Sequence, residues 1–210
     1  MAMAYAVKEI FHSLQGEGAW SGRAAVFCRF SGCNLWSGRE VDRGGAVCRF
    51  CDTDFVGADA GRFDTPAVLA GAVRAAWPAG GTGARLVVLT GGEPLLQLDA
   101  SLCDALRAEG FLVAVETNGT RPRPAGIDWL TVSPKAGAPL ALREGDELKL
   151  VYPQAGASPE CFAGLAFRHF FLQPMDGPDR DANTRAAIAY CLKNPQWRLG
   201  LQMHKVLGLR

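Results

Sequence analysis

At residues 86–94 the chain reads Leu-Val-Val-Leu-Thr-Gly-Gly-Glu-Pro. The first four residues form a short apolar run, which predicts a buried strand. A polar turn follows, and leucines then recur at helical spacing from Leu95 to Leu106, before Gly110. A strand that ends in a polar turn and leads into a helix is one unit of an α/β fold.

The same unit recurs along the chain. Thr65, as an N-cap followed by Pro66, starts a second helix that runs to Trp77, and residues 181–194 favour a third. Alternating strands and helices favour a parallel sheet with right-handed crossovers. Two connections, 115–129 and 132–147, are too short or proline-broken for full helices, so we expect an abbreviated, partly open (β/α) barrel, formed by a single domain over residues 1–210. The other expected strands are 25–30, 111–115, 129–132, 147–151, 169–172 and 197–201.

Polar clusters directly follow five of these strands. The carboxyl ends of parallel strands share one face, where barrel and doubly wound enzymes bind their ligands. We therefore expect one site at that face. The clusters are Thr90 to Pro94, Glu116 to Gly119, Ser133-Pro134-Lys135, Gln173-Pro174-Met175-Asp176 and Gln202-Met203-His204-Lys205.

Three cysteines lie close together as C-x14-C-x2-C: Cys33, Cys48 and Cys51. A structural zinc site or a ferredoxin-type cluster normally takes four protein ligands, so three cysteines leave one coordination position open for a ligand that is not protein. Phe50 and Thr53 add an aromatic ring and a hard oxygen beside this position. The pattern indicates that a metal cluster and a ligand share one pocket.

The glycine pair in the 90–94 turn indicates what that ligand is. Glycines let a backbone approach a ligand closely, and Glu93 offers an anionic acceptor for an ammonium group. Glu116, at the end of the next strand, can accept hydrogen bonds from ribose hydroxyls. An amino acid joined to a nucleoside is S-adenosylmethionine.

The composition limits the kinds of binding partner and the cellular compartment that we expect. The net charge of +1 gives no electrostatic reason to expect nucleic acid as a partner. Seven cysteines, an odd number, fit a reducing compartment better than a disulfide framework. We find neither a secretory signal nor an apolar run of the ~18 residues that a membrane span needs, so we expect a cytoplasmic protein.

Together these motifs resemble the radical S-adenosylmethionine superfamily, whose usual cysteine spacing is C-x3-C-x2-C. The expanded first gap, and the stretch from Ile10 to Gly18, are similar to the 7-carboxy-7-deazaguanine synthases of queuosine biosynthesis. Ser31 to Trp36, Cys51-Asp52-Thr53 and the five strand-end clusters carry the same resemblance, which spans nearly the whole chain.

The resemblance implies an enzyme that converts 6-carboxy-5,6,7,8-tetrahydropterin to 7-carboxy-7-deazaguanine with release of ammonia, after hydrogen abstraction at C6 and ring contraction. It implies a homodimer that uses a 4Fe-4S cluster, S-adenosylmethionine, Mg²⁺ and a flavodoxin-like reductant, with no nucleic acid or membrane partner. The extended loop 33–51 carries the cluster ligands Cys33, Cys48 and Cys51, and Thr53 is the implied magnesium ligand.

The resemblance also implies two sets of binding residues. For Arg29, a structural ion pair remains the alternative to a carboxylate contact with substrate. The implied substrate and catalytic residues are Leu14, Gln15, Gly16, Glu17, Arg29, Thr90, His204 and Arg210. The implied S-adenosylmethionine residues are Phe50, Gly91, Gly92, Glu93, Glu116, Asn118, Ser133, Pro134, Lys135, Gln173, Pro174, Met175 and Asp176.

Two other functions stay open at this point. The three cysteines with His204 or Cys28 could close a tetrahedral zinc site in a small-molecule-binding domain. A radical enzyme of the same superfamily could instead activate a partner by making a glycyl radical, although the chain has no second ferredoxin-like cysteine cluster.

Overall fold

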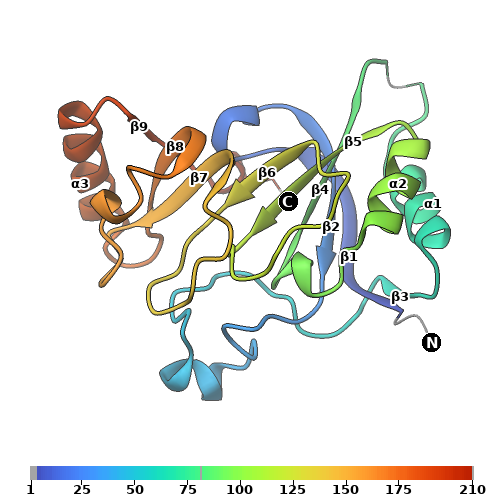
Figure 1. The fold of residues 1–210 in the computed structure, drawn as a ribbon, viewed down its shortest axis with the longest axis horizontal. Coiled ribbons are helices and arrows are strands. Elements are labelled where there is room, and N and C mark those ends of the chain that lie inside the picture. Colours follow the sequence, from blue (N-terminus) through green and yellow to red (C-terminus); the bar gives the residue numbers. More distant parts are fainter. Residues whose placement is uncertain (1–3, 81, 210) are drawn as a thin grey trace.

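The computed structural model describes residues 4–80 and 82–209. Within them one nine-stranded sheet runs through the molecule in the order β3-β1-β2-β4-β5-β6-β7-β8-β9 (Figure 1). The strands are β1 (Tyr5–Leu14), β2 (Ala24–Phe30), β3 (Gly61–Phe63), β4 (Arg85–Gly91), β5 (Phe111–Thr117), β6 (Trp129–Val132), β7 (Glu144–Tyr152), β8 (Ala166–Pro174) and β9 (Trp197–Leu199).

The sheet is parallel from β2 to β9. At its other end, β1 pairs antiparallel with both β2 and β3. The two edge strands β3 and β9 do not pair with each other, so the sheet curls without closing. The predicted abbreviated, partly open barrel is therefore confirmed.

The helices explain why the barrel is incomplete. The α-helices are α1 (Pro66–Ala76), α2 (Ala100–Ala108), α3 (Arg180–Lys193) and α4 (Met203–Leu207). Between β5 and β8, a stretch that the structure describes in full, the connections contain no α-helix. This was predicted for the β5–β6 and β6–β7 connections. In Figure 1, α1 and α2 lie together near the β1 end of the curved sheet, and α3 lies near its β9 end.

The leucine-periodic segment after β4 is not the single helix that we predicted. A short 3₁₀ helix, η3 (Pro94–Leu96), comes first, and α2 begins only after Asp99. The Asp99 side chain accepts a hydrogen bond from the Leu102 amide, which gives α2 its own N-cap. Two short elements satisfy the same leucine spacing, because Leu95, Leu98, Leu102 and Leu106 are all buried.

The ends of the chain also differ from the prediction. The strand β1 was missed, although buried Tyr5 and Val7 alternate with less buried Ala6 and Lys8 in the strand pattern. The last strand ends at Leu199 rather than at residue 201, and the chain then turns into α4. Both ends matter for function, because the loop after β1 and the start of α4 lie against each other.

The two faces of the sheet bury different side chains. The face that α1, α2 and α3 cover carries the main core, which includes Val87, Val113 and Leu148. The other face carries a smaller apolar cluster, which includes Leu86 and Val88. Since successive side chains of a strand alternate, this second face also receives the odd-numbered polar residues of β7.

Candidate active site

A cavity of about 540 Å³ opens at the carboxyl ends of the parallel strands. This volume lies within the usual range for small-molecule sites. It brings the strand-end clusters together with the β1–β2 loop and the cysteine segment. The predicted residues that line it are Leu14, Gln15, Gly16, Glu17, Arg29, Cys33, Cys48, Phe50, Cys51, Thr53, Thr90, Gly91, Gly92, Glu116, Asn118, Ser133, Lys135, Gln173, Pro174, Met175, Asp176 and His204.

Two predicted site residues in the described part of the chain, Glu93 and Pro134, are not in that lining. The prediction for Arg210 falls outside the described residues.

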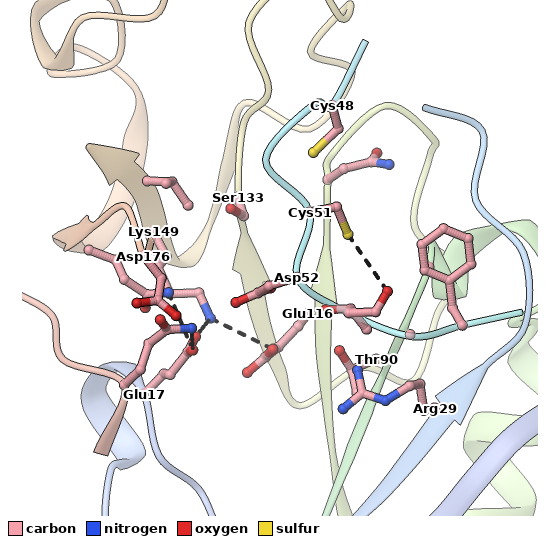
Figure 2. A pocket seen from close by; sticks show the side chains of 18 of the residues that line it. Glu17, Arg29, Cys48, Cys51, Asp52, Thr90, Glu116, Ser133, Lys149 and Asp176 are labelled. Carbon is pink, nitrogen blue, oxygen red and sulfur yellow. Dashed lines mark hydrogen bonds and ion pairs between the residues drawn. The ribbon is translucent and has the colours of Figure 1, made fainter. Parts of the chain in front are cut away.

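The three cysteines lie on one wall of the cavity, and Figure 2 shows Cys48 beside Cys51. The Cys48 thiol donates a hydrogen bond to Cys51, which lowers the pKa of Cys51 to about 6 despite its burial. The Leu35 amide donates to Cys33 Sγ at 3.4 Å. The hydrogen bond between Cys48 and Cys51 raises the pKa of Cys48, and burial raises the pKa of Cys33, so these contacts stabilise only Cys51 as a thiolate. Three cysteines that share one cavity are nevertheless the donor set of an iron–sulfur cluster with one open coordination position.

The described residues contain no group of three or more His, Cys, Asp and Glu side chains arranged to hold a single metal ion. His204 lines the same cavity, but no such group includes it with the cysteines. Cys28 is fully buried on β2. This arrangement does not favour the tetrahedral zinc site that the sequence left open.

The loop between the first two cysteines is partly exposed and partly tied to the cluster ligands. Its 3₁₀ helix η2 (Glu40–Gly45) is largely exposed. However, Arg43 Nη1 donates to the carbonyl oxygens of Arg49 at 2.8 Å and Cys51 at 3.1 Å. The Arg43 guanidinium also stacks over the Trp36 ring, 4.1 Å from its centroid. Arg43 therefore holds the backbone around the last two cysteines.

The turn after β4 packs directly against the cysteine loop. Gly91 has φ of +135°, which favours glycine, and a Cβ on Gly92 would lie 2.9 Å from the Cys33 Cβ. The Gly92 position also touches the Gly32 carbonyl. Only glycine fits between β4 and the first cysteine, which leaves backbone groups of this turn facing the cavity.

Glu93 does not face the cavity, although we predicted that it binds the ammonium group of the cofactor. Its side chain is fully buried, and its oxygens accept hydrogen bonds from Thr117 Oγ1 at 2.6 Å and the Asn118 amide at 2.7 Å. The Leu95 amide donates to the same carboxylate at 2.9 Å. Burial raises the pKa of Glu93, while these three donors oppose the shift. Glu93 thus ties β4 to β5 beneath the turn.

Next to this turn, the ends of β5 and β6 carry a polar pair and a half-buried lysine. Asn118 Nδ2 donates to Asn34 Oδ1 at 3.0 Å, which links β5 to the cysteine loop. Lys135 Nζ donates to the carbonyl and the hydroxyl of Ser133, at 2.8 and 2.7 Å. Burial lowers the pKa of Lys135, and the nearby cysteines partly offset this. The lysine supplies a cation close to the cluster ligands.

Lys149 lies on the far side of the cavity and was not among the predicted site residues. It forms an ion pair with Glu17 and lies 3.6 Å from Glu116 Oε2 (Figure 2). Burial works to lower the pKa of Lys149, but Glu116, Glu17 and Glu147 raise it above its usual value. Burial likewise opposes ionisation of Glu17, but Lys149 and Gln202 lower its pKa. The sequence signal that could have identified it is a lysine inside the predicted buried strand 147–151.

Arg29 and Thr90 are register partners on the neighbouring strands β2 and β4, and both line the cavity. Figure 2 shows them together, across the cavity from Glu17 and Lys149. Arg29 Nε donates to Glu9 Oε1 at 2.7 Å. The ion pair that we had weighed against a substrate contact is therefore present, and Arg29 also reaches the cavity.

The C-terminal helix α4 packs against the loop after β1, the segment after the last cysteine and the loop after β8. Lys205 Nζ bridges Asp176, at 2.7 Å, and Asp52 next to the last cysteine. The Met203 amide donates to the Gly16 carbonyl at 2.9 Å. A Cβ on Gly16 would collide with His204, so the glycine permits this close packing.

A partly open (β/α) barrel with three cysteines and a glycine turn around one cavity defines a protein of the radical S-adenosylmethionine class. The model of the radical SAM superfamily matches residues 43–148. The chain is 65% identical to the 7-carboxy-7-deazaguanine synthase of Caulobacter vibrioides, over 99% of this chain and 100% of the relative. It is 63% identical to that of Bordetella pertussis, with the same coverage.

The structure agrees with the sequence comparison. It resembles the crystal structure of QueE from Escherichia coli with a TM-score of 0.72 and 29% identity, over 96% of this chain and 95% of that one. The chain belongs to the 7-carboxy-7-deazaguanine synthase family of the radical SAM superfamily. Membership implies a 4Fe-4S cluster and S-adenosylmethionine as cofactors.

Proposed function

We propose that this chain converts 6-carboxy-5,6,7,8-tetrahydropterin to 7-carboxy-7-deazaguanine with release of ammonia. The observation that carries the proposal is the single cavity that joins Cys33, Cys48 and Cys51 to a cation at Arg29 and an acidic end at Glu17 and Glu116. One site therefore offers cluster ligands, a partner for a substrate carboxylate and acceptors for a ring edge. The relatives are named for the same product.

The cluster end is built to hold S-adenosylmethionine. When bound there, the reduced cluster and S-adenosylmethionine would supply the radical chemistry needed for hydrogen abstraction at C6 of the pterin. We assign the three cysteines to the cluster and the Gly91-Gly92 backbone to the amino acid part of the cofactor. Glu93 supports that turn from behind. Phe50, Asn118, Ser133 and Lys135, which line the same part of the cavity, surround the nucleoside and carboxylate.

The opposite end is built to hold the pterin. In our proposal the ring edge contacts the end of β1 and the loop after it, through Leu14, Gln15, Gly16 and Glu17, with His204 packed against Gly16. Thr90 lies beside Arg29, across the cavity from Glu17 (Figure 2). Arg29 binds the substrate carboxylate through its guanidinium while Glu9 holds its Nε. The resemblance implied that Glu116 and Gln173 bind S-adenosylmethionine. Because Glu116 contacts Gln15 and Lys149, and Gln173 contacts Glu17, we propose that these two residues also contact the substrate.

We propose Thr53 as a magnesium ligand. Thr53 lines the cavity two residues after the last cysteine. Magnesium prefers hard oxygen donors and keeps several non-protein ligands, so one hydroxyl with substrate oxygens and water is a reasonable set.

We further propose that the enzyme is a homodimer and that it receives electrons from a flavodoxin-like protein. We also propose that residues 1–210 form one domain with an extended loop at 33–51. The family resemblance supports the dimer and the reductant. The seven cysteines support a reducing, cytoplasmic compartment. Among the described residues, no helix is long and apolar enough to cross a membrane.

An anaerobic conversion assay tests the function. Reconstituted protein is incubated with reductant, S-adenosylmethionine, Mg²⁺ and the carboxytetrahydropterin. The products are then separated and identified by mass spectrometry. We expect 7-carboxy-7-deazaguanine, and none from the Cys33→Ala variant. If the wild-type protein cleaves S-adenosylmethionine but forms no carboxydeazaguanine, the proposed substrate is wrong.

A further inference from the structure

We propose that Lys149 is a positioning residue that holds Glu17 and Glu116 as a paired acceptor, and that this pair selects a substrate ring with a 2-amino group over one with a 2-oxo group. The inference rests on the proposed function and deepens it. It adds a specificity determinant at the acidic end of the cavity.

The position of Lys149 follows from the alternation of β7. Leu148 and Leu150 point into the main core, so Glu147 and Lys149 point to the other face, where Lys149 lines the cavity and Glu147 lines a small pocket next to it. There the Lys149 ammonium lies between Glu17, from the loop after β1, and Glu116, from β5. Figure 2 shows the lysine between the two carboxylates. Three separate elements thus meet at one ammonium group.

Other side chains fix the orientation of both carboxylates. Glu17 Oε1 accepts hydrogen bonds from Gln202 at 3.0 Å and Gln173 at 3.3 Å, while Glu17 Oε2 accepts from Lys149. Glu116 Oε1 accepts from Gln15 Nε2 at 3.0 Å. The Glu116 side chain is the more exposed, at 23% against 13% for Glu17. Glu116 is therefore the carboxylate that a ligand reaches more easily.

Acceptors outnumber donors at this end of the cavity. Three carboxylates, on Glu17, Glu116 and Glu147, surround the single ammonium of Lys149. Glu147 is almost fully buried, and its Oε2 accepts from the Ala19 amide at 2.8 Å. Among the described residues, the buried Gln173 Oε1 has no hydrogen-bond partner. Of the three carboxylates, Glu17 and Glu116 line the cavity, where they can accept hydrogen bonds from a ligand edge that donates them.

A 2-amino-4-oxopyrimidine ring presents such an edge, because its ring N–H and amino group both donate. A 2-oxo ring replaces the amino donor with an oxygen, which would face carboxylate oxygens and leave them unpaired. Rejection of an analogue that lacks the expected donor is strong when the polar groups of a site are buried. Removing Lys149 would leave two carboxylates close together, which favours protonation of one of them and weakens this selection.

The test measures binding rather than turnover. Anaerobic titration calorimetry, with S-adenosylmethionine present, gives the affinities of 6-carboxypterin and of its 2-oxo analogue, 6-carboxylumazine. We expect wild-type protein to prefer the pterin, and Lys149→Met to reduce that preference by on the order of 30-fold, as for the loss of one partner of a buried charge pair. Lys149→Arg should restore part of the preference, because it keeps the charge.

Two further variants keep the result interpretable. Lys8 also bridges two carboxylates, Asp54 and Asp59, but does not line the cavity. Lys8→Met should therefore leave the preference unchanged. If Lys149→Met does not fold, Glu116→Gln, at a more exposed side chain, should show the same loss of preference.

The outcomes separate the inference from the function on which it rests. Wild-type protein that forms product, together with a Lys149→Met variant that prefers the pterin as strongly as wild type, would overturn the role of Lys149 alone. Wild-type protein that binds neither ligand and forms no product would overturn the proposed function, and the inference with it.

Discussion

The carboxylate of Glu93 accepts a 2.6 Å hydrogen bond from the hydroxyl of Thr117, across the pair of strands β4 and β5. With the Asn118 and Leu95 amides, this bond places a buried carboxylate behind the Gly91-Gly92 turn. The turn that faces the cysteines therefore depends on a side chain that does not itself reach the cavity.

Glu93→Ala should consequently weaken binding of S-adenosylmethionine and lower stability. The change leaves two backbone amides and one hydroxyl without their acceptor, at a cost of about 1–3 kcal/mol for each group that stays buried and unpaired. Anaerobic calorimetry with S-adenosylmethionine and thermal unfolding measure both effects. Unchanged cofactor affinity in a folded Glu93→Ala protein would show that the turn holds its shape without Glu93.

Arg43→Ala should accelerate loss of the cluster. The variant removes two hydrogen bonds to the backbone around Cys51 and the stacking contact on Trp36. Decay of the visible absorbance of the cluster in air measures the rate. Arg39→Ala is the matched control, since Arg39 is exposed in the same loop and should decay as wild type does. Equal rates for both variants would refute the role given to Arg43.

Thr53→Ala should leave the cluster intact and weaken the dependence of activity on magnesium. The threonine hydroxyl is the only protein ligand that we propose for the ion, so its removal should raise the magnesium concentration needed for half-maximal activity by on the order of tenfold, as for the loss of one ligand contact. Titration of activity with Mg²⁺ measures this concentration. An unchanged magnesium response would remove Thr53 as a ligand.

The contact between Lys205 and Asp176 should depend on pH. The hydrogen bond from Lys205 lowers the pKa of Asp176 below its ordinary value of 3.8. Because the folded-state pKa is the lower one, the contact stabilises the fold above about pH 3.8, and that contribution is lost as the pH falls through the folded-state value. Lys205→Met should therefore lower the midpoint of thermal unfolding at pH 7, and the difference from wild type should shrink below pH 3.8. A difference that is constant with pH would contradict this.

The sequence predicted the parallel part of the sheet and most of the cavity lining because both follow local rules. Apolar runs such as 86–89 define strands, and the polar residues that follow them share one face by the geometry of parallel sheets. The leucines from Leu95 to Leu106 misled us, since helical spacing also fits a 3₁₀ turn followed by a short helix that Asp99 caps. Boundaries of this kind depend on a single cap.

The missed parts depend on tertiary contacts. In the sequence, Lys149 is an ordinary charged residue in a strand. Its partners Glu17 and Glu116 are each over 30 residues away, and only the fold brings them beside it. Glu93 belongs to a turn that reads as a ligand site, but its direction is set by Thr117 on the next strand. Pattern alone places a residue at the end of a strand and does not say whether its side chain faces the cavity.

The central claim is that Cys33, Cys48 and Cys51 hold a cluster with one iron open to S-adenosylmethionine. The most direct test is an anaerobic electron paramagnetic resonance spectrum of the reconstituted, reduced protein with and without S-adenosylmethionine. We predict a reduced-cluster signal that shifts when the cofactor is added, and no such signal from Cys33→Ala. A wild-type signal that does not respond to the cofactor, or zinc in place of the cluster, would contradict the claim.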